Sequence, residues 1–187
     1  MYGPDALAAG ASPVTTAAFV IVMVLAAILD LRSRRIPNAL TVTGVAAALL
    51  LRAPLGWGAL ADGALGVGLA LLLTVPFFLV KAMGGGDVKL MAAVGAFMGP
   101  VELLGACLLI GLLGGILALV EAARRGALRR VVVNVAYMMM RLVSPIRREL
   151  VPTLTSPEAM AIPYGVPIAV GALAWWFYGG MDVWLRS

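Results

Sequence analysis

Long apolar runs alternate along the chain with short stretches that carry most of the charged residues. A hydrocarbon core about 30 Å thick needs about 20 apolar residues per helix, so the pattern predicts about six membrane-spanning helices joined by short loops. The expected segments are 14–29, 39–51 with a less polar tail to 57, 61–80, 88–99, 103–120 and 159–178. The predicted fold class is therefore all-α, a polytopic membrane protein.

One part of the pattern does not fit a span. Within residues 122–158, the apolar stretch 131–140 has only about half the length that a span requires. Polar residues recur in this segment at helical spacing, namely Arg130, Asn134, Arg141 and Arg148. They predict an amphipathic helix lying on the inner leaflet, with its arginines facing anionic lipids. The simpler interpretation is a topological anchor.

The composition supports a membrane protein and narrows its chemistry. The chain is 63% hydrophobic and 12% charged, with a mean hydropathy of +1.04, which excludes an ordinary soluble domain. Histidine is absent and Cys107 is the one cysteine, so neither a zinc site of Cys and His nor a Ser-His-Asp or Cys-His arrangement can form. No metal, cofactor or nucleic acid is expected.

The net charge of +5 matters mainly through its placement. If the first span runs from outside to inside, all of the 14 Lys and Arg residues except Arg52 and Arg186 fall on the inner side. Basic residues are retained in the cytoplasm, so both termini are expected outside it, and Asp30 and Asp87 near the inner face.

Asp30 and Asp87 stand apart from the other acidic residues. Acidic side chains in or beside a span are costly, and by default they indicate a functional site. Asp30 ends the first apolar run, and Asp87 follows three glycines and starts a short apolar helix. That helix rises only about 20 Å, which puts Asp87 below the inner surface. The glycines 84–86 suit an irregular chain path that lines a wet cavity.

Two such carboxylates can act together. Across a small wet cavity they can share one proton, because like charges at close range disfavour double ionisation. The ionised member can then activate water while the protonated member polarises a peptide carbonyl. Peptide hydrolysis by this scheme needs no cofactor.

Simpler interpretations exist for each residue. Asp30 could be an interfacial charge paired with the arginines of residues 32–35. Lys89 could mark topology or pair with Asp87. Pro37 could end one helix and Asn38 cap the next.

Three segments together resemble the motif regions of type IV prepilin peptidases, the GxGD membrane aspartic proteases. They are residues 30–38 (DLRSRRIPN), 84–90 (GGGDVKL) and 162–167 (IPYGVP). The resemblance implies that Asp30 and Asp87 are catalytic and that Gly84 and Gly86 are the signature glycines. The resemblance also implies further residues in the active-site loops or in support of the catalytic pair, namely Arg32, Pro37, Asn38, Lys89, Pro163, Tyr164 and Gly165.

The same resemblance implies a membrane-embedded aspartic endopeptidase that removes the leader peptide of type IV or Flp-type prepilins. Cleavage is expected at the cytoplasmic face of the bacterial inner membrane. The partners implied are prepilin-like substrates and membrane lipids, and a homo-oligomer is left open. Longer members carry an inserted methyltransferase domain with CxxC motifs. With Cys107 alone, residues 1–187 are expected to form a single transmembrane peptidase domain, as in the peptidases of Flp or tight-adherence pili.

Two other functions use the same residues. A proton- or cation-coupled carrier could employ both aspartates without catalysis, although small carriers usually show a repeat symmetry that this sequence lacks. A catalytically silent assembly factor would tolerate loss of both carboxylates.

Overall fold

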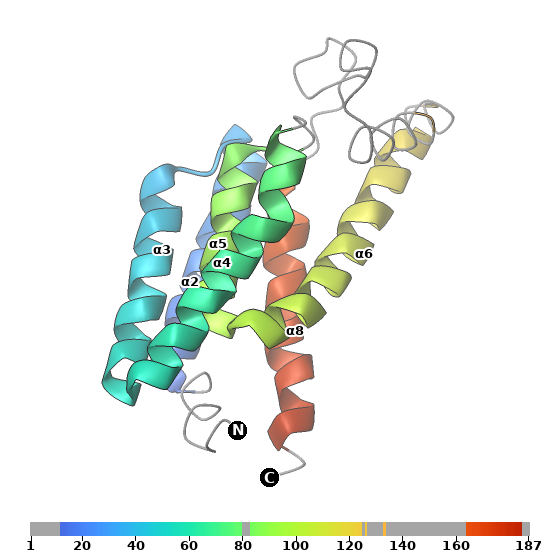
Figure 1. Ribbon diagram of the computed structural model, residues 1–187. Helices are drawn as coiled ribbons and strands as arrows, with labels where there is room; N and C mark the ends of the chain where they lie inside the picture. The colour runs from blue at the N-terminus through green and yellow to red at the C-terminus, as the bar shows by residue number, and fades with distance from the viewer. Residues whose placement is uncertain (1–11, 80–82, 125, 127–132, 134–163, 185–187) are drawn as a thin grey trace.

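The computed structural model describes residues 12–79, 83–124, 126, 133 and 164–184, and the regular structure within them is helical. The helices form a bundle of elements that run up and down beside one another, with α6 tilted away from the rest (Figure 1). They are α2 (Pro13–Ser33), α3 (Asn38–Arg52), the 3-10 helix η1 (Ala53–Leu55), α4 (Trp57–Leu79), α5 (Gly85–Met98), α6 (Pro100–Arg124) and α8 (Gly165–Trp184). The predicted all-α fold is confirmed.

The helices have the character of membrane spans. By length and composition, Pro13–Ser33, Asn38–Leu55, Trp57–Leu79 and Pro100–Arg124 can each cross a bilayer, while α8 is apolar over Gly165–Tyr178. Large apolar side chains such as Leu50, Leu72 and Leu108 are exposed on the surface of the bundle. A surface of this kind suits hydrocarbon and not water, as expected of a polytopic membrane protein.

Several boundaries differ from those predicted, among them the end of α2 at Ser33, the start of α6 at Pro100 and the end of α8 at Trp184. Helix α4 begins at Trp57 and not at residue 61, and α6 continues to Arg124 and not only to residue 120. Residues 122–124 therefore extend α6, where Ala122 is fully buried, and do not begin an interfacial helix. Apart from residues 126 and 133, the rest of that expected segment lies outside the described residues.

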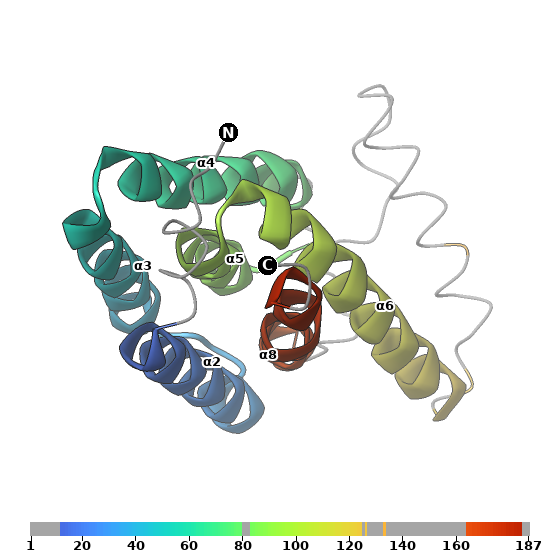
Figure 2. The same ribbon diagram turned by 90° about the horizontal axis from the view of Figure 1, so that it is seen from below.

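Helix α5 lies at the centre of the bundle, enclosed by α2, α3, α4 and α8 (Figure 2). Its residues from Leu90 to Met98 are all buried. Gly95 meets Gly66 of α4 so closely that a Cβ atom on either residue would overlap the backbone of the other helix. Small residues allow helix backbones to approach in this way. The core is therefore built around one short helix.

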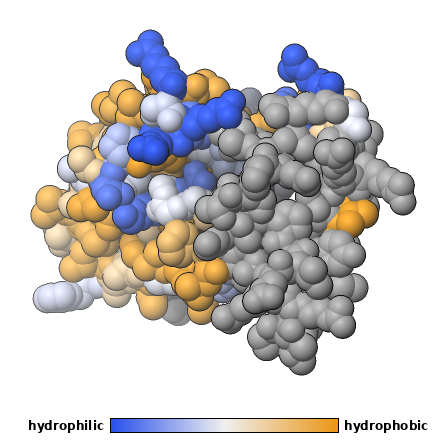
Figure 3. Space-filling model, turned by 90° about the horizontal axis from the view of Figure 1, so that it is seen from above, coloured by the Kyte–Doolittle hydropathy of each residue, from blue (hydrophilic) through white to orange (hydrophobic). Residues whose placement is uncertain are grey.

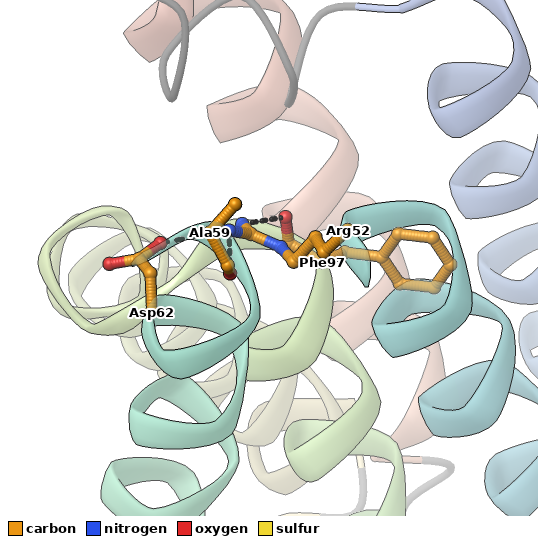
Figure 4. Close-up of polar contacts among 4 residues, drawn as sticks. All are labelled: Arg52, Ala59, Asp62 and Phe97. Atoms are coloured by element: carbon orange, nitrogen blue, oxygen red, sulfur yellow. Dashed lines mark hydrogen bonds and ion pairs between the residues drawn. The ribbon is translucent and has the colours of Figure 1, made fainter. Parts of the chain in front are cut away.

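A buried arginine binds the C-terminal end of α5 (Figure 4). Arg52 Nη2 donates a hydrogen bond of 2.7 Å to the carbonyl of Phe97, in the last turn of α5. Its Nη1 donates to Asp62 Oδ2 at 2.9 Å and to the carbonyl of Ala59 at 3.2 Å. Arg52 is 6% exposed. One guanidinium thus joins α3, α4 and α5 and satisfies a helix-terminal carbonyl inside the protein.

We expect Arg52→Met to lower the thermal unfolding temperature of the detergent-solubilised protein. The substitution leaves the Asp62 carboxylate and the Phe97 carbonyl without their charged donor, and breaking a buried pair in this way costs about 3 kcal/mol or more. Arg124→Met is the matched control, because Arg124 is exposed at the end of α6. Equal unfolding temperatures for the two variants would contradict the role given to Arg52.

Candidate active site

Asp30 lies in the last turns of α2 and is 5% exposed. Its Oδ2 accepts a hydrogen bond of 2.7 Å from the backbone N–H of Gly165, the first residue of α8. The exposed side chains of Arg32, Arg34 and Arg35 form no ion pair with it. Arg34 acts on Asp30 only through an electrostatic interaction without a salt bridge, so the direct contact that holds the carboxylate is the Gly165 N–H and not an arginine.

Gly165 is fitted closely to Asp30. A Cβ atom at this position would lie 2.8 Å from Asp30 Oδ2, 2.9 Å from Ile36 Cδ1 and 3.0 Å from Asp30 Cβ. A residue with a side chain cannot occupy this position without displacing the carboxyl group. Gly165 belongs to the third motif segment, residues 162–167. The close contact therefore shows that this segment packs against Asp30 through the start of α8.

Asp87 lies in the first turn of α5. The helix begins at Gly85 and not at Asp87 as expected, with Gly84 as its N-cap. The half-buried Asp87 carboxylate turns back toward Gly84. A Cβ atom at Gly84 would lie 3.0 Å from Asp87 Oδ2. The free N–H groups at a helix N-terminus stabilise a carboxylate placed there.

The aspartates belong to one end of the molecule. The end of α2 and the starts of α5 and α8 all lie at the upper end of Figure 1. Asp30 and Asp87 are close enough to interact electrostatically. Viewed from above in Figure 3, this end exposes hydrophilic side chains surrounded by hydrophobic ones. Two carboxylates from separate helices thus share one polar site at the edge of an apolar bundle.

Ile36 joins the three segments, a role that the sequence analysis did not assign. It is buried in the connection between α2 and α3. A Cβ atom at Gly86 would lie 3.2 Å from Ile36 Cβ, and one at Gly165 would meet Ile36 Cδ1. Ile36 therefore packs between the starts of α5 and α8. The one feature of the sequence that could have indicated this role of Ile36 is its position as a lone apolar residue between Arg35 and Pro37.

The remaining predicted residues have mixed outcomes. Lys89 Nζ donates a hydrogen bond of 2.8 Å to Asn38 Oδ1 and forms no ion pair with Asp87. Asn38 does not cap α3, because it is the first residue of that helix. The N-cap of α3 is Pro37, which makes no side-chain cap hydrogen bond.

Pro37 also does not end the preceding helix. Helix α2 ends at Ser33, and Arg34 follows in a left-handed conformation with φ of 51°. Tyr164 lies one residue before α8 and extends toward Gly114 of α6. Pro163 lies outside the described residues. Within the described part of the chain, no group of three or more His, Cys, Asp or Glu residues could hold a metal ion.

A helical membrane protein with two interacting carboxylates at one end has the groups needed for acid–base hydrolysis within a bilayer. Comparison with known proteins agrees with this class. The model of the type IV leader peptidase family matches residues 17–119, more than half of the chain, and the protein belongs to that family. Its function is therefore type IV leader peptidase-like. No curated protein and no solved structure matches the chain.

The matched region includes Asp30, Asp87 and the glycines before Asp87, and it ends ahead of Tyr164 and Gly165. The hydrogen bond from Gly165 therefore adds to the site a segment that the family match does not cover.

We expect Gly165→Ala to lower peptidase activity on the order of 100-fold, since a displacement of about 1 Å at a reacting group can have that effect. The new methyl group would push the Asp30 carboxyl out of position. Gly68→Ala is the control, because a Cβ atom at Gly68 of α4 meets nothing within 4 Å. Rates of substrate cleavage by the purified variants measure the difference. Similar activity in both would show that the fit around Gly165 has no bearing on catalysis.

Proposed function

We propose that this protein is an aspartic endopeptidase that removes the leader peptide of prepilin-like proteins, with Asp30 and Asp87 as its catalytic pair. The observation that carries the proposal is the pairing of a buried Asp30, held by the Gly165 N–H, with an Asp87 that interacts with it from a second helix. Membership of the type IV leader peptidase family supplies the class of substrate.

The proposed chemistry uses one proton shared by the pair. The ionised carboxylate removes a proton from water, whose oxygen forms a bond to the scissile carbonyl carbon. The protonated carboxyl group gives its proton to the carbonyl oxygen, so a neutral tetrahedral intermediate forms. When the C–N bond breaks, the leaving nitrogen takes the proton first removed from water, and a hydroxyl proton returns to the other carboxylate. The pair again holds one proton, as at the start.

The surroundings of the pair support this scheme. Asp30 accepts a backbone hydrogen bond from Gly165, and Asp87 lies against Gly84 in the first turn of α5, so backbone at helix starts adjoins both carboxylates. Backbone donors at helix starts move little, which keeps the two carboxylates oriented before a substrate arrives. The proposed activity is peptide hydrolysis alone, without methyl transfer.

The proposal places cleavage at the cytoplasmic face of the inner membrane. The exposed Arg32, Arg34, Arg35 and Lys89 flank the two aspartates along the chain, at the same end of the bundle. Basic residues of this kind are retained on the cytoplasmic side. At the opposite end, Arg52 is buried in its hydrogen bonds and Trp57 is exposed, as an interfacial aromatic residue can be.

Asp30→Asn and Asp87→Asn should each abolish cleavage of a prepilin-like substrate by membranes that contain the protein. Each variant removes one of the two groups that exchange protons during the reaction. Glu102→Gln is the control, because its amide oxygen can still accept the 2.8 Å hydrogen bond from Trp175 Nε1. Unaltered processing by either aspartate variant would rule out the proposed pair. Cation or proton uptake by liposomes, with no cleavage, would favour a carrier instead.

Orientation can be tested with single cysteines in a Cys107→Ser background. A membrane-impermeant maleimide should label Trp57→Cys in intact spheroplasts and Arg34→Cys only after the membrane is opened. Both positions are exposed and they lie at opposite ends of the bundle. The reverse labelling pattern would put the aspartates at the outer face.

A further inference from the structure

Tyr164 precedes Gly165, the residue that binds one member of the proposed catalytic pair. The next residue, Gly165, holds Asp30 through its backbone N–H. The partly buried side chain of Tyr164 interacts electrostatically with Asp87, from the other segment of the site. Tyr164 thus lies next to the residue that binds Asp30, and it belongs to neither of the helices that carry the two aspartates.

The tyrosine ring fits a space left by a glycine of α6. A Cβ atom at the buried Gly114 would lie 2.9 Å from Tyr164 Oη and 3.1 Å from Tyr164 Cζ. These are the outermost atoms of the ring, so the missing side chain at Gly114 is what admits the hydroxyl group. A phenylalanine at position 164 would need less of that space.

The Tyr164 hydroxyl makes no hydrogen bond with the residues that the structure describes. A tyrosine hydroxyl removed from water usually has a partner, because an unmet donor costs free energy. Here the group with which Tyr164 interacts is Asp87, one of the two proposed catalytic residues. A donor with no hydrogen-bond partner among the described residues, next to the segment that holds Asp30, is available to a bound peptide.

We propose that Tyr164 is a further catalytic residue, whose hydroxyl donates a hydrogen bond to the carbonyl oxygen of the scissile peptide bond as negative charge develops on it. This inference rests on the proposed peptidase function of the pair. Tyr164 keeps its proton throughout, so the proton balance between the aspartates and water is unchanged. A fixed donor aimed at that oxygen lowers the barrier to attack by water.

Tyr164→Phe tests the proposal with the full-length protein and a prepilin-like peptide of known cleavage site. Loss of one such donor should lower kcat about 100-fold and change KM by less than about twofold, since the bond strengthens in the transition state. Tyr178→Phe is the matched control, because Tyr178 lies on α8 but is 75% exposed. A kcat for Tyr164→Phe within about threefold of the unmodified protein, or a loss confined to KM, would overturn the proposal.

Gly114→Ala provides an independent test. The added methyl group should displace the tyrosine ring and lower kcat in the otherwise unmodified protein. In the Tyr164→Phe background it should lower kcat little further, since the group it displaces is already absent. Losses that simply multiply in the double variant would contradict the proposal.

The two proposals fail separately in these experiments. Inactive Asp30 and Asp87 variants combined with a fully active Tyr164→Phe would refute the role of Tyr164 alone. Active aspartate variants would refute the peptidase pair, and the role of Tyr164 with it.

Discussion

The rest of the structure depends on the burial of α5, a helix of 14 residues that rises only about 21 Å. Such a helix leaves its terminal N–H and C=O groups within the protein, where each needs a partner. Arg52 satisfies the carbonyl of Phe97 at one end, and the Asp87 carboxylate lies in the first turn at the other. The side chain proposed to be catalytic thus lies where the helix presents its free N–H groups.

The site itself is shaped largely by backbone. Asp30 receives a hydrogen bond from the Gly165 N–H, Asp87 lies against Gly84, and Gly86 and Gly165 leave the space that Ile36 fills. Side chains at these glycine positions would occupy the volume in which the carboxylates are oriented. The glycines near the site therefore serve close packing and not chain flexibility, because each is a point of close contact.

Much of this arrangement could be predicted from the sequence. The hydropathy pattern indicates the apolar helices, and the two aspartates are recognisable because they are acidic residues at the ends of apolar segments. Helix α5 was expected to be short, and it is. Arg52 was assigned to an outer loop and is buried, since its partners at 59, 62 and 97 come together only in the folded chain.

The residues whose roles were wrongly predicted also depend on contacts between distant segments. Asn38 had the composition of a cap but bonds to Lys89, which is 51 residues away in the chain. Ile36 drew no attention because nothing local reveals that two glycines will pack against it. Properties of single segments were predictable, whereas contacts between segments were not.

The contact of Gly66 with Gly95 has a mechanical consequence. Where backbone meets backbone, no side chain lies between the helices that could change rotamer and let them slide. Helices α4 and α5 therefore move as one body, and Arg52 ties α3 to them. In the proposed reaction, a substrate that reaches Asp87 enters between other helices and leaves this three-helix block intact.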